Sequence, residues 1–278
     1  MKKISRRSFM AAAAVSVAAL ALTACGGSAS SAASSVASSA ASSEAVSSAA
    51  AAELTTVEAG KLTMATNATF PPYEMTTDSG EIEGIDVDTA KAIAEKLGLE
   101  LQIDDMEFDA ALLSVQQGKA DIVMAGVTVT DERKAVMDFS DSYATGIQSI
   151  IVPEGSDITS PDDLAGKKIG TQRGTTGYIY CSDDFGDENV VAYDDGLTAV
   201  QALNNGQVDA VVIDNAPAQE FIAANPGLKI LDTSYAEEDY AIGMAKGSSL
   251  EDAVNAALEE LKADGTLQSI VDKYITAE

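Results

Sequence analysis

The sequence of 278 residues contains no histidine and only two cysteines. Histidine is the commonest general base near neutral pH and a frequent metal ligand. Its absence removes the usual residue for both tasks. We therefore predict no catalytic residue, no metal site and no cofactor.

Basic residues are scarce as well, with 17 Lys and Arg against 44 Asp and Glu, which gives a net charge of −27. The first 24 residues hold four of the basic residues and no acid, so the remainder carries 13 basic residues and a net charge of −31. Such a chain repels the phosphates of nucleic acid, which we exclude as a partner. The acidity favours solubility and repulsion from anionic surfaces.

The first 24 residues have the pattern of an export signal. Four basic residues precede an apolar run over residues 9–22, which is too short for the roughly 20 residues of a membrane-spanning helix. Small residues then lead to Cys25, which resembles the lipobox of bacterial lipoproteins. We predict a signal peptide over residues 1–24 and a lipid on Cys25 as the only membrane contact; a cleaved signal without lipid is the alternative. The stretch SRRSF at residues 5–9 resembles a twin-arginine motif, so either export route is open.

Residues 25–54 are rich in Ala and Ser, and this composition predicts a tether rather than a packed core. The roughly 220 residues that follow are long for a single hydrophobic core and comfortable for two lobes. With Cys25 acylated, Cys181 has no partner for an intrachain disulfide. Cys181 is either a small buried residue or a free thiol.

Two segments set 88 residues apart follow the same plan. Residues 108–126 read FDAALLSVQQGKADIVMAG, and residues 196–214 read GLTAVQALNNGQVDAVVID. In each, apolar residues at helical spacing lead to a glycine that suits a left-handed helix cap, and a short apolar strand follows at 121–125 or 209–213. Strands that are apolar along their whole length are typical of parallel sheets buried on both faces.

The same alternation continues through the rest of the chain. We predict further strands over residues 61–66, 99–103 and 167–171, and further helices over residues 86–97, 250–261 and 266–274. Strand–helix alternation in two similar halves predicts two α/β lobes. Ligands of open α/β sheets bind outside the carboxyl ends of the strands, so the equivalent strand ends at Gly126 and Asp214 are candidate site positions.

Five stretches carry a resemblance to a known family. They are TNATFPPYEM at residues 66–75, GIDVDTAKAIAEK at 84–96, AGVTVTDERK at 125–134, GTQRGTTG at 170–177 and AVVIDNAPA at 210–218. In order and spacing they resemble the motifs of the bacterial extracytoplasmic amino-acid-binding proteins, the solute receptors of ABC importers (solute-binding protein family 3). The resemblance covers nearly all of the chain after the tether.

This resemblance implies a fold and a set of partners. The fold is the two-lobed periplasmic-binding-protein-like clamp, an α/β fold in which each lobe is a mostly parallel sheet flanked by helices and two crossovers form the hinge. We assign residues 55–147 and 241–278 to lobe 1 and residues 148–240 to lobe 2. The implied partners are an amino-acid ligand and an ABC permease. We expect a monomer that is extracytoplasmic and anchored to the cell membrane as a lipoprotein.

Arginine is rare after the signal, and Arg133 is one of only two. A guanidinium presents a fork of donors that matches a carboxylate bidentately. The resemblance implies that Arg133 binds the ligand's α-carboxylate, together with the Thr128 hydroxyl and the backbone at Gly126. From the other lobe, Thr175 and Thr176 can offer hydroxyl and backbone N–H groups to the same carboxylate. The alternative is that Arg133 is an ordinary surface cation.

Asp214 ends the second strand of the repeat. The resemblance implies that its carboxylate receives the ligand's α-ammonium. A carboxylate at a strand end could instead cap the following turn, which Asn215 and Pro217 favour. We predict that Arg133 and Thr128 bind first and that Asp214 and Thr176 engage when the lobes close.

Phe70 and Phe108 match the family positions whose rings flank the ligand's side chain, and packing in the core is their alternative. Asn67 matches a position that is often acidic in relatives that bind basic side chains. Its neutral amide predicts a polar, uncharged L-amino acid such as glutamine or cystine. The sequence does not show whether Gln172 or Arg173 points inward.

Two other functions remain open on the same fold. One is an enzyme such as a cyclic-acid dehydratase, for which Glu74 is the candidate acid or base. The other is an amino-acid-sensing surface lipoprotein, which would keep the ligand site and lack a permease partner.

Overall fold

The computed structural model of the chain describes residues 54–275. The chain divides into two units, Met1–Ala49 and Ala50–Glu278, and every described residue belongs to the second. The predicted signal peptide, the lipidated Cys25 and all but the last residue of the predicted tether lie outside the described residues. Within residues 54–275, no helix combines the length and the apolar character needed to cross a membrane.

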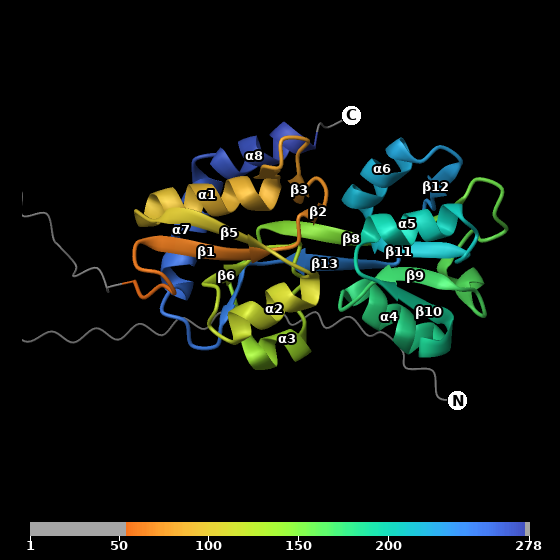
Figure 1. Cartoon of the computed structure of the whole chain (residues 1–278), viewed down its shortest axis with the longest axis horizontal. Coiled ribbons are helices and arrows are strands. Elements are labelled where there is room, and N and C mark those ends of the chain that lie inside the picture. The colour runs from red at the N-terminus through yellow and green to blue at the C-terminus, as the bar shows by residue number, and fades with distance from the viewer. Residues whose placement is uncertain (1–53, 276–278) are drawn as a thin grey trace, which may run out of the picture. The chain divides into compact units, whose positions relative to one another are not determined.

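The first sheet has five strands in the order β5-β1-β6-β14-β7. Its strands are β1 (Lys61–Thr66), β5 (Glu100–Asp105), β6 (Ile122–Val123), β7 (Met137–Phe139) and β14 (Gly243–Ala245). Strand β1 pairs in parallel with β5 and β6, whereas β14 is antiparallel to β6 and β7. The helices of this part are α1 (Ile85–Leu97), α2 (Phe108–Gln116), α3 (Asp131–Val136), α7 (Glu251–Ala263) and α8 (Thr266–Tyr274). Helices α1 and α8 lie on one side of the sheet, and α2 and α3 lie on the other (Figure 1).

The second sheet has the order β10-β9-β11-β8-β12, with β13 also paired to β8. Its strands are β8 (Ala144–Pro153), β9 (Ile169–Gln172), β10 (Val190–Tyr193), β11 (Ala210–Asp214), β12 (Leu228–Ile230) and β13 (Ala236–Tyr240). Strands β9, β10 and β11 are parallel, and β8 is antiparallel to its three neighbours. The helices of this part are α4 (Thr176–Phe185), α5 (Gly196–Asn204) and α6 (Asn215–Ala224). Short 3₁₀ turns lie at Pro161–Leu164, before β9, and at Asp187–Asn189, after α4.

Two long antiparallel strands connect the sheets. The chain leaves the first sheet through β8 and returns through β13, which pair from Ala144 with Tyr240 to Gln148 with Ala236. A small antiparallel sheet of β2 (Thr69–Phe70), β3 (Glu74–Thr76) and β4 (Ile82–Glu83) follows β1. The result is a two-lobed α/β fold whose sheets are flanked by helices, as predicted. The lobe boundaries drawn at 147/148 and 240/241 fall in or beside the connecting strands, and they stay a prediction.

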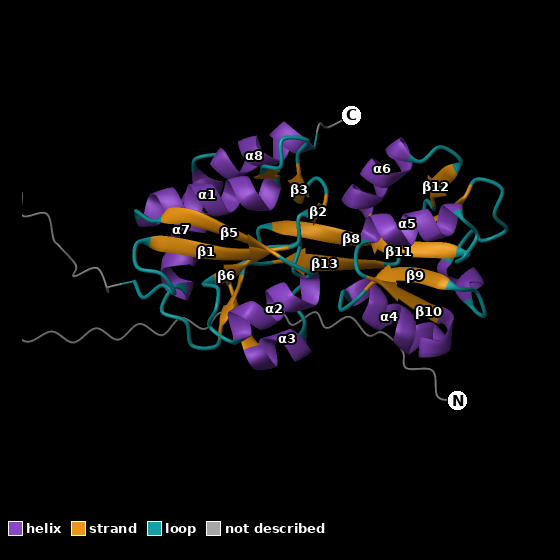
Figure 2. Cartoon of the chain, viewed as in Figure 1, coloured by secondary structure: helices purple, strands orange, loops and turns teal. Residues whose placement is uncertain are grey.

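The helices and strands of the predicted repeat are confirmed, since α2 precedes β6 and α5 precedes β11 (Figure 2). Strand β6 covers only Ile122–Val123 of the predicted 121–125, and the backbone N–H groups of Asp121 and Met124 beside it donate to the carbonyls of Thr63 and Ala65 on β1. Helix α1 shows how local sequence sets these elements. Gly98 ends it in the left-handed conformation with φ 71°, and its apolar face is buried at Ile85, Val87, Ala90, Ile93 and Ala94.

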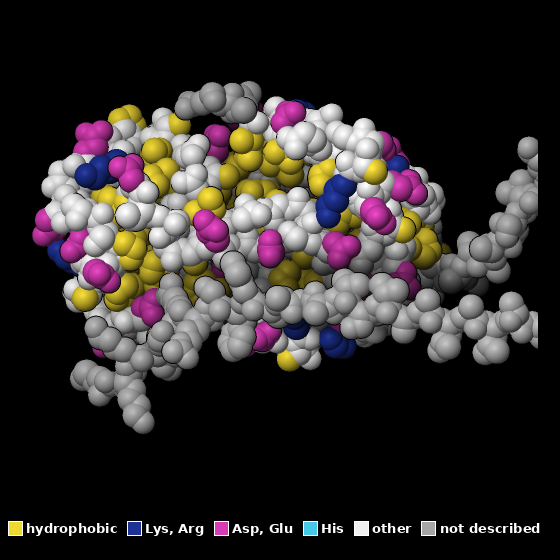
Figure 3. All heavy atoms as spheres, turned by 180° about the vertical axis from the view of Figure 1, so that it is seen from behind, with side chains coloured by type: hydrophobic (Ala, Val, Ile, Leu, Met, Phe, Trp, Pro, Cys, Tyr) yellow, Lys and Arg dark blue, Asp and Glu magenta, His cyan; other side chains and the backbone are white. Residues whose placement is uncertain are grey.

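The acidic side chains are dispersed over the surface rather than clustered in one patch. On the face seen in Figure 3, Asp and Glu side chains are scattered, and Lys and Arg side chains lie among them. The negative charge of this face is therefore spread over several elements, which fits a role in solubility better than a single charged docking patch.

Candidate ligand-binding site

All nine residues that the sequence analysis proposed as ligand contacts line one cavity. They are Asn67, Phe70, Phe108, Gly126, Thr128, Arg133, Thr175, Thr176 and Asp214. The space between these residues amounts to about 440 Å³ when the part that is open to solvent is counted. Their shared location is an observation; their contact with a ligand stays a prediction.

The topology explains why these positions meet. Asn67 follows β1, Gly126 lies beyond the end of β6, and Asp214 is the last residue of β11. Gln172 ends β9 and lines the same cavity, although its orientation was open from the sequence. The site therefore lies at the carboxyl ends of parallel strands from both sheets, where α/β folds commonly bind ligands.

Arg133 is buried and held on both sides of the cavity. Its side chain is only 8% exposed, so the alternative of an ordinary surface cation is wrong. Nη1 donates to the backbone carbonyl of Thr128 at 2.7 Å, and Nη2 donates to the carbonyl of Gly174 at 3.2 Å. The guanidinium also lies over the Phe108 ring, 5.4 Å from its centroid. Burial lowers the pKa of Arg133, an effect that the charge of Glu238 opposes, and the guanidinium remains a cation.

Asp214 is a buried carboxyl that is 7% exposed. Although it occupies the N-cap position of α6, its side chain makes no capping hydrogen bond, so the capping alternative is wrong. Oδ2 accepts from Gln148 Nε2 at 2.7 Å, and Oδ1 receives no hydrogen bond within the described residues. Burial raises the pKa of Asp214 to about 7; the charge of Glu238 adds to this rise, while the nearby Tyr240 hydroxyl and Gln148 oppose it. A cation at Oδ1 would restore the charged form.

Glu238 is a site residue that the sequence analysis missed. It lies on β13, is 7% exposed, and its Oε2 accepts from the hydroxyls of Thr128 at 3.1 Å and Thr176 at 2.9 Å. Gln148 Nε2 donates to the same oxygen at 3.0 Å. One signal could have found it, because Glu238 and Tyr240 are the buried positions of an alternating strand, and an acid at an inward position needs partners.

The hydroxyl of Thr175 serves the backbone rather than the cavity. It accepts from the N–H of Tyr178 at 3.2 Å as the N-cap of α4, and it donates to the carbonyl of Gln172 at 2.8 Å. The first N–H groups of α4 have no partner within the helix, so this terminus is suited to an anion. Thr175 therefore contributes to the cavity indirectly, by capping the helix that begins at Thr176.

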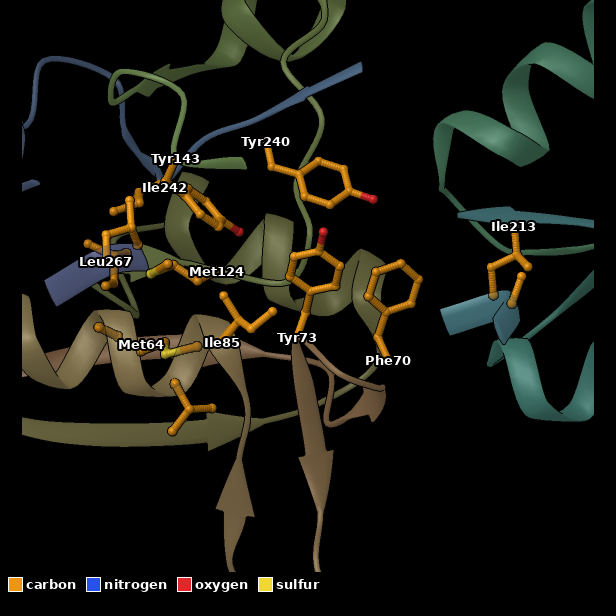
Figure 4. Close-up of a cluster of buried hydrophobic side chains, with 14 of the residues drawn as sticks. Met64, Phe70, Tyr73, Ile85, Met124, Tyr143, Ile213, Tyr240, Ile242 and Leu267 are labelled. Atoms are coloured by element: carbon orange, nitrogen blue, oxygen red, sulfur yellow. The ribbon is translucent and has the colours of Figure 1, made fainter. Parts of the chain in front are cut away.

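Aromatic rings and amides line the remainder of the cavity. Phe70 is stacked on Tyr73, which meets the ring of Tyr240 edge to face, and Figure 4 shows the three rings side by side. Gln172 Nε2 donates to Asn67 Oδ1 at 2.8 Å, so Gln172 points inward. Arg173 does not line the cavity; its side chain is 56% exposed and lies 3.7 Å from Asp194.

A pair of buried carboxyl groups lies beside the cavity. Asp86 Oδ2 accepts from the backbone N–H of Gly126 at 2.9 Å and from the Tyr143 hydroxyl at 2.8 Å. Burial and the charge of the nearby Asp86 hold the pKa of Glu74 well above its usual range. Burial likewise raises the pKa of Asp86 to about 6, against the hydrogen bonds that it accepts. Glu74, which lines the cavity, is therefore protonated more readily than an exposed glutamate.

Cys181 is a structural residue. It is fully buried and forms no disulfide, and burial raises the pKa of its thiol to about 12. A thiol with such a pKa stays protonated and unreactive at neutral pH. The prediction that Cys181 is a small buried residue is confirmed, and its thiol, although free of a disulfide, is not accessible to solvent.

Comparisons with known proteins identify the family of this chain. The sequence model of the bacterial extracellular solute-binding proteins, family 3, matches residues 62–277. The chain is 33% identical over 226 residues to the L-cystine-binding protein TcyJ of Escherichia coli (strain K12), covering 80% of this chain and 85% of TcyJ. It is also 33% identical over 228 residues to the arginine-binding extracellular protein ArtP of Bacillus subtilis (strain 168), covering 78% of this chain and 87% of ArtP.

Solved structures agree with the sequence comparisons. An ancestral arginine-binding protein bound to glutamine is 42% identical, with a TM-score of 0.75 over 78% of this chain and 99% of that one. An ancestral arginine-binding protein bound to arginine is 43% identical, with a TM-score of 0.74 over 78% and 98%. Since the family model spans most of the chain and these relatives are matched over most of their length, the chain belongs to the bacterial extracellular solute-binding proteins, family 3.

Proposed function

We propose that this protein is an extracytoplasmic receptor that binds an L-amino acid between its two lobes and delivers it to an ABC permease. The observation that carries the proposal is that one cavity is lined by a buried cation, Arg133, and a buried acid, Asp214. An α-amino acid is a zwitterion, so it offers a counter-charge to each group. Buried charges without partners are costly, so a ligand that satisfies both is strongly favoured.

The two ends of the ligand backbone are held by different elements. Arg133 binds the α-carboxylate with donors that its two carbonyl partners leave free, and the first turn of α4 at Thr176 supplies backbone N–H groups. Asp214 accepts the α-ammonium at Oδ1. Because Arg133 and Asp214 belong to the two proposed lobes, 55–147 with 241–278 and 148–240, the ligand stabilises the closed clamp.

For the ligand's side chain we propose a polar, uncharged group such as that of glutamine or cystine. The paired amides of Asn67 and Gln172 offer donors and acceptors, and the rings of Phe70 and Phe108 offer apolar contact. Glu74 supports the same preference as long as it is protonated. Relatives that bind cystine or glutamine are consistent with this choice.

One observation favours a second candidate, an amino acid with a cationic side chain. Glu74 lines the cavity, although its role was open from the sequence. A guanidinium or ammonium beside it would favour the ionised carboxylate. The ancestral protein bound to arginine is consistent with this candidate.

Transport is favoured over the two other functions considered. The family and the named relatives are solute-binding proteins rather than enzymes, which supports binding over a dehydratase with Glu74 as its acid or base. We propose in addition that the protein is anchored to the cell membrane through a lipid on Cys25, as the signal and tether pattern of the sequence predicts, and that it works as a monomer. A permease gene beside its own would separate transport from sensing.

The proposal is tested by titrating the soluble domain with the twenty L-amino acids and cystine. At 100 times its dissociation constant, a true ligand stabilises the fold by about 2.7 kcal/mol, which a thermal-shift screen detects. Arg133→Ala should weaken binding of the best ligand at least tenfold, about 1.4 kcal/mol. Arg173→Ala is the matched control, because that arginine is exposed and outside the cavity.

Two results would count against this assignment. The receptor role fails if no amino acid shifts the melting temperature, or if Arg133→Ala binds like the Arg173→Ala control. The preference for uncharged side chains fails if arginine or lysine binds tightest by tenfold or more.

A further inference from the structure

Three donors from different elements converge on one oxygen of Glu238. They are the hydroxyl of Thr128 after β6, the hydroxyl of Thr176 in the first turn of α4, and the amide of Gln148 on β8. The two hydroxyl oxygens are 3.5 Å apart. A buried carboxylate on a connecting strand therefore joins side chains that belong to the two sides of the cavity.

The contact with Glu238 limits the hydrogen bonds that the two threonine hydroxyls can make to a ligand. A hydroxyl has one proton to donate and two lone pairs with which to accept, whereas a carboxylate can only accept. When Thr128 and Thr176 donate to Glu238, neither has a proton left for another acceptor. What each can present to the cavity is a lone pair. The expected role of the Thr128 hydroxyl as a donor to the ligand's carboxylate conflicts with this geometry.

The surroundings of Glu238 favour the same arrangement. Besides the three donors, Arg133 and Tyr180 lie near Glu238. The charge of Glu238 opposes the lowering of the Arg133 pKa by burial, and it adds to the rise that burial causes in the pKa of Tyr180. Asp214 accepts from the same Gln148 amide group that donates to Glu238. Gln148 therefore lies between the two acids and donates to both. Glu238 also accepts from the two threonines, whereas Asp214 Oδ1 receives no hydrogen bond within the described residues.

We propose that Glu238 is a positioning residue that fixes the hydroxyl protons of Thr128 and Thr176, so that both threonines act as acceptors toward the ligand's α-ammonium beside Asp214. This inference rests on the proposed function. The α-carboxylate is then left to Arg133 and to backbone N–H groups. Selection for the amine follows, because a ligand without it leaves buried acceptors with no donor, which is costly.

The test compares each amino acid with its deamino counterpart. Wild-type protein is titrated calorimetrically with L-glutamine and glutaramic acid, and with L-arginine and 5-guanidinopentanoic acid. The readout is the ratio of dissociation constants, deamino over amino. In E238A the hydroxyls are free to rotate and donate to the carboxylate, so the ratio should fall at least tenfold, about 1.4 kcal/mol. A purely structural role for Glu238 would raise both constants by the same factor and leave the ratio unchanged.

Further variants keep the inference falsifiable if E238A does not fold. E238Q retains an oxygen that can accept the hydroxyl protons, so its ratio should stay within about threefold of wild type; a ratio as low as in E238A contradicts the proposal. T128V removes one acceptor, together with the hydrogen bond that Thr128 donates to Glu238, while it leaves Glu238 itself in place. Its ratio should also fall, and a wild-type ratio in T128V overturns the proposal. E237A is the matched control on the exposed side of β13. If wild type binds neither L-glutamine nor L-arginine while another amino acid binds, the same comparison is made with that amino acid; if none binds, the proposed function itself fails.

Discussion

Binding of an amino acid should weaken as the pH falls through about 7, because the group that accepts the α-ammonium titrates there. Burial raises the pKa of Asp214 to about 7 in the free protein. Only the carboxylate form attracts the ammonium as a charge. The perturbation is therefore the pH itself, and Asp214→Asn is the variant that removes the titration while keeping an acceptor oxygen at the same position.

The magnitude follows from that pKa. Below pH 7 the ionised fraction of Asp214 falls about tenfold for each pH unit, and the apparent affinity falls with it. Between pH 8 and pH 5 the dissociation constant should rise by about a hundredfold, or about 2.7 kcal/mol. Asp214→Asn should bind weakly at every pH, near the wild-type affinity at pH 5. Glu74 and Asp86 titrate in both proteins, so the ratio of wild type to variant isolates Asp214.

The same shift predicts the stability of the free protein, with the opposite sign. The pKa of Asp214 is about 7 in the folded state against 3.8 for the unfolded chain, so the folded state binds more protons between these values. The free energy of unfolding should therefore fall as the pH rises from about 4 to 7 through this group, and ligand should restore it. Calorimetric titration at pH 5, 6, 7 and 8 measures the binding, and urea denaturation measures the stability. A wild-type dissociation constant that is flat from pH 5 to 8, or an Asp214→Asn variant with the wild-type slope, would refute the reasoning.

Two further predictions concern a glycine and the anchor. Gly146 should be needed for a well-formed site, because a Cβ there would lie 2.5 Å from two ring atoms of the buried Tyr240 and 2.6 Å from Asp214 Oδ1; Gly146→Ala should lower the free energy of unfolding by about 1–3 kcal/mol and weaken ligand binding, as denaturation and titration would show. Gly155→Ala is the control, since its Cβ would meet open space, and equal behaviour of the two variants would contradict the packing argument. Cys25→Ser should release the protein from the membrane fraction, because anchoring depends on lipid chains on that thiol; a variant that still sediments with membranes after a high-salt wash would show that the lipoprotein prediction is wrong.

Local sequence pattern predicted many of the helices and strands. Helical periodicity and glycine stops predicted α1, α2, α5, α7 and α8 to within a few residues, because the apolar face and the cap of a helix are properties of adjacent residues. The repeat predicted that Gly126 and Asp214 end equivalent strands. They belong to different sheets, and both line the same cavity because it lies at the carboxyl ends of parallel strands from the two sheets.

The residues with rare chemistry were also visible in the sequence. Arg133 stood out because arginine is scarce in an acidic chain, and Cys181 because it had no partner. Each reading left an alternative open, surface cation or accessible thiol, and the sequence could not choose between them. Burial decided both, since burial depends on what the remainder of the chain packs against them.

The sequence by itself determined the two α/β halves, the charged pair Arg133 and Asp214, and the family resemblance, all of which are written in short-range pattern and motif. Only the tertiary structure revealed Glu238, which meets Thr128 across 110 residues of chain, and the inward turn of Gln172, which meets Asn67 across 105. It also decided that Glu74 shares a buried site with Asp86 rather than standing alone. The physical reason is that a hydrogen bond or a shifted pKa depends on the neighbours in space, and connecting strands such as β8 and β13 bring together groups that no local periodicity relates.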